Sequence, residues 1–326
     1  VIFITLIILY TFKGGIKTII WTDTLQTTFM LLALVLSIVM ISKDLDFGFA
    51  ELVRKIFDSD YTNMIVSDWA PRNNYLKQFF SGMFITIVMT GLDQEMMQKN
   101  LSCRNIRDAK KNMISFSFIM VAVNFIFLFL GAALFTYANA KGINLSALAS
   151  SDEIFPTITI NYLGPFAGLI FFIGLISAAY PSADGALTAL TTSFCIDFLG
   201  IQKRNDLSEK SKTRMRYMVH IGFAIVMLAV VLAFRSFYDK ALIDKLFTIA
   251  GYTYGPLLGL YAFGLFTKLK VKDKWVPVVA ILSPVICYIL SDNSFAWFGY
   301  RFGFELLILN GLLTFAGLVI LRTKKV

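Results

Sequence analysis

Apolar residues fill long stretches of this chain, and short polar segments separate them. Most stretches have about 17 residues or more, enough for a helix to cross roughly 30 Å of hydrocarbon. Backbone groups in hydrocarbon must find hydrogen-bond partners within their own segment, so these stretches predict helices. The pattern predicts about nine transmembrane helices, the first of them incomplete: Val1–Phe12, Thr24–Ile41, Phe79–Gln98, Met113–Ala138, Leu163–Leu190, Met218–Phe234, Leu246–Phe266, Trp275–Leu290 and Leu306–Leu321.

The composition supports an all-α polytopic membrane protein. Hydrophobic residues make up 57% of the 326 residues and charged residues only 16%, whereas soluble domains carry roughly 25% charged residues. A formal net charge of +9 would suggest nucleic-acid binding in a soluble protein, but here the basic residues lie between apolar stretches. Membrane topology explains them better, so we expect a lipid bilayer and no nucleic acid as partner.

Basic residues are concentrated in every second loop. If these loops are cytoplasmic, the positive-inside rule places the C-terminus in the cytoplasm as well. The stretch Leu163–Ile196 tests this assignment, because Pro181 could divide it into two short spans. Two spans would put the basic clusters Lys99–Lys111 and Lys203–Arg216 on opposite sides of the membrane. We therefore expect one long, interrupted helix.

Two segments on the outer side predict additional helices. Loop 43–74 is the longest, and its amphipathic pattern favours a helix at the membrane surface. The apolar positions of that pattern are Phe49, Leu52, Val53 and Phe57. The segment Ser146–Asn161 is the second candidate for such a helix.

The sequence contains no catalytic or nucleotide-binding motif. It has no GxxxxGK[ST] stretch, no HExxH and no nucleophile elbow. Cys103, Cys195 and Cys287 are far apart, and the single His220 cannot anchor a multi-histidine metal site. We therefore expect neither an enzyme nor an ATP-driven transporter. Polar groups and helix breakers inside the spans become the functional candidates.

The fifth span holds the richest candidate site. Pro181 has no N–H group, so the carbonyl of Ser177 loses its helical donor. Ser182 and Asp184 add a hydroxyl and a carboxylate nearby, and such oxygens suit a small hard cation such as Na⁺. The alternative is a proline-kinked packing helix whose small residues fit against neighbouring helices.

Two further stretches combine polar residues with helix signals. Asp23 follows Trp21 at the cytoplasmic mouth of the second span, where it is a candidate on a cation pathway. An interfacial helix cap beside an aromatic anchor explains Asp23 equally well. The stretch Gly251–Gly259 interrupts the seventh span with glycine and proline and includes Tyr254, which fits either ligand contact or close helix packing.

At these residues the chain resembles the sodium:solute symporter family, which includes sodium/glucose, proline, pantothenate, monocarboxylate and sialic acid transporters. The stretches that carry the resemblance occur in the family's order and spacing and cover nearly the whole chain. They are Gly14–Gln26, Gly91–Ser102, Ser182–Asp184 with Thr191–Asp197, and Tyr254–Gly259.

The resemblance implies a five-plus-five inverted-repeat transporter fold with alternating access, present here in part. The chain opens with Val1 inside an apolar run and has no basic n-region, which we interpret as a truncated start rather than a signal peptide. Residues 1–326 would then form a single transmembrane transporter domain. On the family's plan it divides into the end of the first repeat (1–42), an outer loop (43–74), the second repeat (75–268) and two flanking helices (269–326).

The resemblance also implies site residues. The family's shared sodium site takes a backbone carbonyl and two adjacent hydroxyl residues from one core helix, and these positions fall on Ala178, Pro181 and Ser182. Pro181 replaces the first hydroxyl. Some members bind a second sodium near positions that match Asp23, Ser182, Asp184 and Gly185. The solute-contacting positions of sugar-transporting relatives fall on Thr86 and Met89, which weakens a sugar assignment, and Tyr254 is a third solute candidate.

The sequence therefore predicts an inner-membrane secondary transporter that couples Na⁺ influx, with Na⁺ as the coupling ion, to uptake of a small organic solute. Two alternatives remain open. One is a symporter-like module that senses solute and signals through an attached domain. The other is a proton-coupled carrier that uses Asp23 or Asp184.

Overall fold

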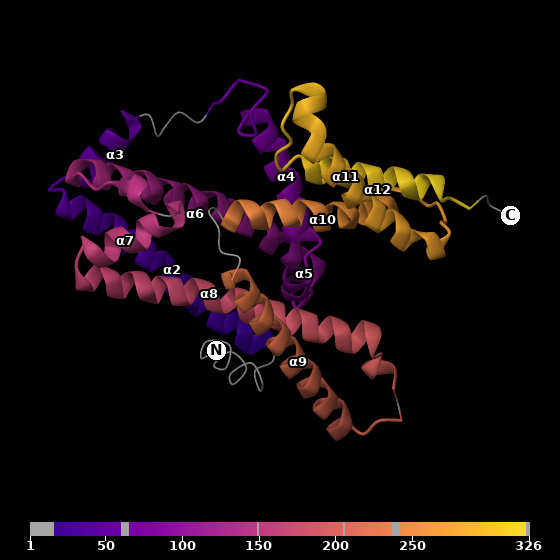
Figure 1. The fold of residues 1–326 in the computed structure, drawn as a ribbon. Coiled ribbons are helices and arrows are strands. Elements are labelled where there is room, and N and C mark those ends of the chain that lie inside the picture. The colour runs from indigo at the N-terminus through magenta and orange to yellow at the C-terminus, as the bar shows by residue number, and fades with distance from the viewer. Residues whose placement is uncertain (1–15, 60–64, 149, 205, 237–241, 324–326) are drawn as a thin grey trace. The chain divides into compact units, whose positions relative to one another are not determined.

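The computed structural model describes residues 16–59, 65–148, 150–204, 206–236 and 242–323, and within these ranges the chain is helical without a β-strand (Figure 1). The predicted span Val1–Phe12 lies outside the described residues. The α-helices are α2 (Ile16–Asp44), α3 (Phe49–Phe57), α4 (Tyr75–Gly91), α5 (Gln94–Leu101), α6 (Ile106–Lys141), α7 (Ile154–Asn161), α8 (Pro165–Ser193), α9 (Glu209–Ser236), α10 (Leu242–Phe266), α11 (Val276–Phe298) and α12 (Leu306–Ile320).

Short helical turns connect some of these elements. A π-helical turn, Phe194–Phe198, directly follows α8. Single 3₁₀ turns lie at Leu145–Ala147, Ser151–Glu153, Ile201–Lys203 and Asp273–Trp275.

The chain forms two compact units, which are described separately. Unit 1 comprises residues 1–62 and 98–240 and holds α2, α3, α6, α7, α8 and α9. Unit 2 comprises residues 63–97 and 241–326 and holds α4, α10, α11 and α12. The boundary between the units falls within α5.

In unit 1, α2 and α8 pack along each other in antiparallel directions (Figure 1). Small residues allow the close approach: a Cβ atom built on Gly174 of α8 would lie 2.6 Å from the Cβ of Ala33 of α2. At one end of the unit, Tyr137 of α6 donates a hydrogen bond of 2.7 Å to the Asp44 carboxylate, and Lys141 forms an ion pair of 2.9 Å with it. The ends of α2 and α6 are therefore joined by paired charges.

The helix α8 is one long element, as predicted, but it continues through Pro181 without the predicted interruption. Helices also occur in both segments that the sequence predicts to lie on the outer side. In the first, α3 buries Leu52 and Ile56 against α6 and α2. In the second, α7 buries Ile154 and Ile158.

The predicted span Phe79–Gln98 is not one helix. The helix α4 ends at Gly91, and α5 begins at Gln94 after a short break. The carboxylate of Asp93 accepts a hydrogen bond of 3.1 Å from the backbone N–H of Met96, which is the contact of a helix N-cap. A capping residue two positions after Gly91 thus starts a new helix where the apolar pattern alone suggested one continuous span.

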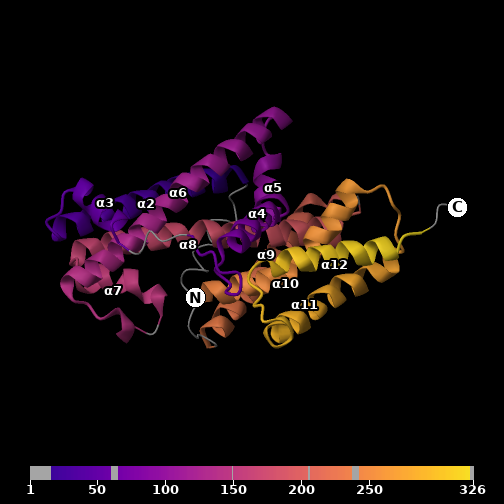
Figure 2. The ribbon, with the colours of Figure 1, turned by 90° about the horizontal axis from the view of Figure 1, so that it is seen from above.

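In unit 2, α12 lies along α10 and α11 (Figures 1 and 2). Two glycines of α10 permit the contact. A Cβ on Gly255 would collide with the side chain of Asn310, and one on Gly259 would lie 2.6 Å from Thr314. Glycines at such positions let helix backbones approach closely, as in the small-residue interfaces of membrane helices.

Asn310 compensates for the proline of α10. Pro256 cannot donate to the carbonyl of Tyr252, four residues earlier in the helix. The Asn310 side-chain amide, fully buried, donates to that carbonyl at 3.0 Å and to the Gly251 carbonyl at 3.2 Å. Its oxygen accepts a hydrogen bond of 2.6 Å from Ser283 of α11. One side chain therefore connects all three helices.

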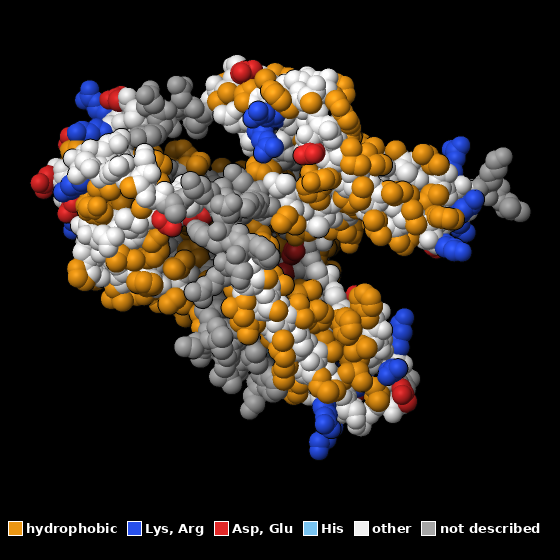
Figure 3. Space-filling model, viewed as in Figure 1, with side chains coloured by type: hydrophobic (Ala, Val, Ile, Leu, Met, Phe, Trp, Pro, Cys, Tyr) orange, Lys and Arg blue, Asp and Glu red, His pale blue; other side chains and the backbone are white. Residues whose placement is uncertain are grey.

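Five helices among the described residues are long and apolar enough to cross a membrane, and α12 is a shorter apolar helix. They are Ile20–Asp44, Ile106–Lys141, Pro165–Phe198, Glu209–Phe234 and Asp273–Phe298. Figure 3 shows hydrophobic side chains along the helices in view and Lys and Arg side chains gathered near helix ends and loops. The count of nine spans stays a prediction.

Substitution Asn310→Ala should destabilise unit 2, because it leaves two buried carbonyls without this donor. We expect a loss of about 1–3 kcal/mol in the free energy of unfolding. The measurement is thermal unfolding in detergent. Unfolding is monitored by the reaction of Cys287, which is buried in the folded protein, with a thiol-reactive dye. Asn293→Ala is the matched control, since the Asn293 side chain bonds to Ile289 of its own helix. Equal unfolding midpoints for the two variants would contradict the connecting role of Asn310.

The predicted orientation can be tested with cysteines in a background that lacks the three native ones. Ser208→Cys should react with a membrane-impermeant maleimide only after the cytoplasmic face is opened, because its loop is one of the basic ones. Asp152→Cys should react in intact cells. Reaction of both from the same side would refute the orientation and the single crossing by α8.

Candidate functional site

Four of the five predicted sodium residues lie on α8 in unit 1, and the fifth, Asp23, lies on α2. Ser177 and Asp184 are buried, and Asp184 has an exposed fraction of 0%. Ala178 and Ser182 are exposed, and Pro181 is half-buried. This division follows from helix geometry, in which each residue turns about 100° around the axis.

The same geometry shows which oxygens can act together. Ala178 and Ser182 are four residues apart, so they lie about 40° apart on one face of the helix. Asp184 lies about 200° around the helix from Ser182. The structure therefore brings together the Ala178 and Ser182 positions, and it places the Asp184 side chain on a different, buried face. The freed carbonyl of Ser177 is one residue before Ala178.

Asp23 has a partner that sequence reasoning missed. Its carboxylate forms an ion pair of 2.8 Å with Lys99 of α5, and the two side chains are 15% and 27% exposed. Lys99 belongs to the stretch Gly91–Ser102 and to the basic cluster assigned to the cytoplasm. The place of both residues at the cytoplasmic mouth stays a prediction.

The antiparallel packing of α2 and α8 also relates the two carboxylates to each other. Asp23 precedes Ala33 by ten residues, and Asp184 follows Gly174 by ten residues. At 1.5 Å per residue, both lie about 15 Å along their helices from the Ala33–Gly174 contact, in the same direction. Asp23 and Asp184 are therefore at a similar level of unit 1, although the sequence suggested different depths.

The C-terminal half of α8 is also joined to α9. The Thr191 hydroxyl lies 3.1 Å from Nδ1 of His220, and both side chains are buried. Leu187 and Ala224 pack one turn away. Among the described residues, no cluster of three or more His, Cys, Asp or Glu side chains is arranged to bind a metal ion.

The predicted solute residues lie in unit 2. Met89 of α4 and Tyr254 of α10 line one small cavity of about 10 Å³, with room for about one water molecule. Phe247, Gly251 and Phe304 form part of its wall. Thr86 is exposed on the same face of α4 but does not line this cavity. The structure therefore brings two of the three candidates together.

The comparison with known proteins identifies the family. The model of the sodium:solute symporter family matches residues 1–272 of the 326 residues. The chain belongs to this family. Its members are transporters rather than enzymes, as predicted from the missing catalytic motifs.

Two bacterial members of the sodium:solute symporter family are similar along most of the chain. The sodium/sialic acid symporter NanT of Aliivibrio fischeri is 23% identical over 95% of this chain and 62% of its own length. The sodium/sialic acid symporter SiaT of Proteus mirabilis is 25% identical over 90% of this chain and 60% of its own. The human sodium-coupled monocarboxylate transporter 1 is 23% identical over 78% of this chain and 42% of its own length. The chain thus spans less than two thirds of the length of these relatives.

A solved structure has the same fold. A Na⁺-coupled sialic acid symporter, in a substrate-bound outward-open state, superimposes with a TM-score of 0.76 at 22% identity. The alignment covers 97% of this chain and 66% of that structure. The all-α architecture predicted from the sequence is confirmed.

The ion pair between Asp23 and Lys99 predicts energetic coupling. Asp23→Asn and Lys99→Gln should each lower the free energy of unfolding by about 1–2 kcal/mol, because each removes the opposite charge from a mostly buried partner. The double variant should lose clearly less free energy of unfolding than the sum of the losses in the two single variants. Thermal unfolding in detergent measures this double-mutant cycle.

The matched control is the pair Lys55 and Glu51, which is about half exposed and 3.9 Å long. Its cycle should show little coupling. Strictly additive effects at Asp23 and Lys99 would show that the pair does not hold α2 against α5.

Proposed function

We propose that the protein couples Na⁺ influx to the uptake of a small organic solute across the bacterial inner membrane. The observation that carries the proposal is the single helix α8, which continues through Pro181 and leaves Ala178 and Ser182 exposed on one face. Membership in the sodium:solute symporter family supports the same reading.

The sodium site would use the oxygens of this exposed face. Na⁺ is a hard cation, and interrupted helices of transporters offer it backbone carbonyls. We assign the Ala178 carbonyl and the Ser182 hydroxyl as ligands, with the Pro181 carbonyl or the freed Ser177 carbonyl in place of the hydroxyl that Pro181 lacks. Asp184 and Asp23, at a similar level, would form the cation pathway or a second sodium site.

The solute would be recognised in unit 2 by Met89 and Tyr254, with Thr86 on the same face of α4. The named relatives take sialic acid and monocarboxylates, which makes these the first solutes to test. On this proposal the C-terminus is cytoplasmic and residues 75–268 are the second repeat. Coupling is reciprocal, so sodium raises solute affinity by the factor by which solute raises sodium affinity.

Uptake into cells that express the protein from its full reading frame tests the proposal. Labelled sialic acid and pyruvate should accumulate in Na⁺ medium and should not accumulate when choline replaces Na⁺ at fixed pH. Uptake that follows pH and ignores Na⁺ would identify a proton-coupled carrier instead. Saturable binding of a solute without uptake under either gradient would favour a sensor.

Ser182→Ala should raise the half-saturating Na⁺ concentration several-fold, because it removes one ligand oxygen and keeps the Cβ for packing. Solute affinity at saturating Na⁺ should stay near normal. Sodium-titrated uptake measures both quantities. Ser177→Ala is the matched control, since that hydroxyl lies on the buried face and its carbonyl is retained. Unchanged sodium dependence in Ser182→Ala would favour the alternative, a proline-kinked packing helix.

A further inference from the structure

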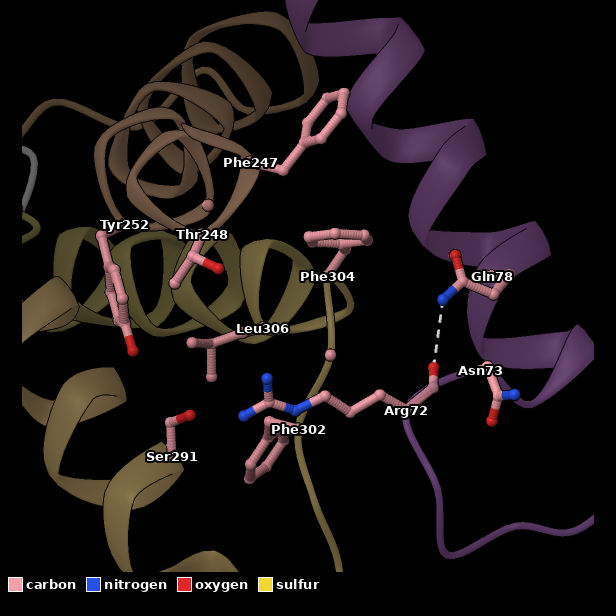
Figure 4. A pocket seen from close by; sticks show the side chains of 12 residues that line it. Arg72, Asn73, Gln78, Phe247, Thr248, Tyr252, Ser291, Phe302, Phe304 and Leu306 are labelled. Carbon is pink, nitrogen blue, oxygen red and sulfur yellow. Dashed lines mark hydrogen bonds between the residues drawn. The ribbon is translucent and has the colours of Figure 1, made fainter. Parts of the chain in front are cut away.

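Unit 2 contains a larger cavity that none of the predicted sodium or solute residues lines. It has a volume of about 230 Å³ and lies between the segment before α4, the first turns of α10, the end of α11 and the start of α12 (Figure 4). A second cavity of about 320 Å³ shares four of its lining residues: Arg72, Thr248, Tyr252 and Ser291. The predicted topology places all these segments toward the outer side.

The charge of this cavity favours an anion. Among the twelve residues that line it, Arg72 is the one ionised side chain, and no carboxylate is present. The second cavity adds Arg301 and one acid, Asp292. A guanidinium group can bind a carboxylate through two parallel hydrogen bonds, which makes arginine the residue best suited to planar anions.

The surroundings of Arg72 complete a binding site for such an anion. Figure 4 shows the guanidinium extending toward Ser291 and Leu306, with Phe302 on one side and Phe304 on the other. The hydroxyl of Ser291 lies on the cavity wall beside the charge. Ligand sites typically combine a few such polar groups with apolar and aromatic walls. The aromatic rings would accept the body of a ligand whose carboxylate faces Arg72.

The segment that carries Arg72 is held in place by Lys77 and Asn74, so the site is preorganised. The buried Lys77 ammonium donates to the carbonyls of Pro71 at 3.3 Å and Arg301 at 3.5 Å, and lies 3.6 Å from the centre of the Tyr300 ring. Asn74 caps α4 through the N–H groups of Leu76 and Lys77.

Further hydrogen bonds hold the residues on both sides of the cavity in place. The Asn74 amide donates to the carbonyl of Asp68 at 3.0 Å, and Gln78 donates to the carbonyl of Arg72 at 3.1 Å. On the opposite side, Tyr300 donates to Glu305, and burial together with that bond raises the pKa of the Tyr300 hydroxyl. Tyr300 therefore remains a donor at physiological pH. Binding to an ordered site of this kind loses less conformational entropy.

We propose that this cavity binds a small organic anion, whose carboxylate pairs with the Arg72 guanidinium while its apolar body lies against Phe302 and Phe304. The site shares no residue with the proposed sodium site. A volume of about 230 Å³ is below the usual range of drug-sized pockets, so the cavity suits a carboxylate with a single ring or a short chain.

Titration calorimetry with benzoate on the detergent-solubilised protein tests this site, with choline in place of sodium. Benzoate should bind saturably, and benzamide, its neutral counterpart of similar shape, should bind much more weakly. Arg72→Gln should weaken benzoate binding roughly tenfold or more, because it removes a charge-assisted contact. Arg72 is exposed, so this variant should keep the wild-type unfolding temperature.

Arg54→Gln is the matched control. Arg54 is an exposed arginine of α3 that pairs with Asp58 at 3.6 Å and lies outside the cavity. Its substitution should leave benzoate affinity unchanged. Absence of saturable binding, equal affinity in Arg72→Gln and the wild type, or acetate binding as tight as benzoate would overturn the proposal. The assay contains no sodium, so a failure of sodium-coupled uptake would not change its outcome.

Discussion

A proline inside a membrane helix leaves one carbonyl without its N–H donor, and hydrocarbon supplies no water to replace it. The described residues include an internal proline in α8, in α10 and, as Pro284, in α11, and α8 and α10 respond to theirs in different ways. In α10, the Asn310 amide bonds to the Tyr252 carbonyl that Pro256 cannot reach. That contact requires α12 to lie very close, which explains why Gly255 has no room for a side chain. In α10, a side chain of a neighbouring helix therefore supplies the hydrogen bond that the proline removes.

Pro181 of α8 likewise leaves one carbonyl without its helical N–H donor, but on a part of the helix that has exposed residues. The carbonyl that it releases belongs to Ser177, and the next residue, Ala178, shares an exposed face with Ser182. A bound cation can satisfy released carbonyls as well as an amide can, and it can leave again, whereas Asn310 is covalently part of the chain. The two helices thus use one backbone defect in two ways, for permanent cohesion in unit 2 and for the proposed reversible ion binding in unit 1.

Much of this organisation could be predicted from local sequence. Uninterrupted apolar stretches specified α6 and α9, and the loop charges decided correctly that α8 is one helix despite Pro181. What escaped prediction depends on contacts between distant residues or on capping. The helix break at Asp93 arises from one carboxylate bonding three residues ahead. Lys99 was counted as a loop charge, because nothing in its neighbourhood shows that Asp23, far away in sequence, is its partner. Asn310 is an isolated polar residue in an apolar helix, and only the position of Pro256 could have suggested its role.

Helix periodicity also limits the roles that the acidic residues can have. A sodium ion next to Ser182 would lie on the exposed face of α8, about 200° around the helix from the Asp184 side chain. Asp184 therefore cannot serve as a direct ligand of that same ion unless the helix unwinds between the two residues. It shares its level with Asp23, and Asp23 already has the charge of Lys99 beside it. The ion pair with Lys99 compensates part of the Asp23 charge, so the strength of this pair sets how much negative charge Asp23 adds to the proposed cation pathway.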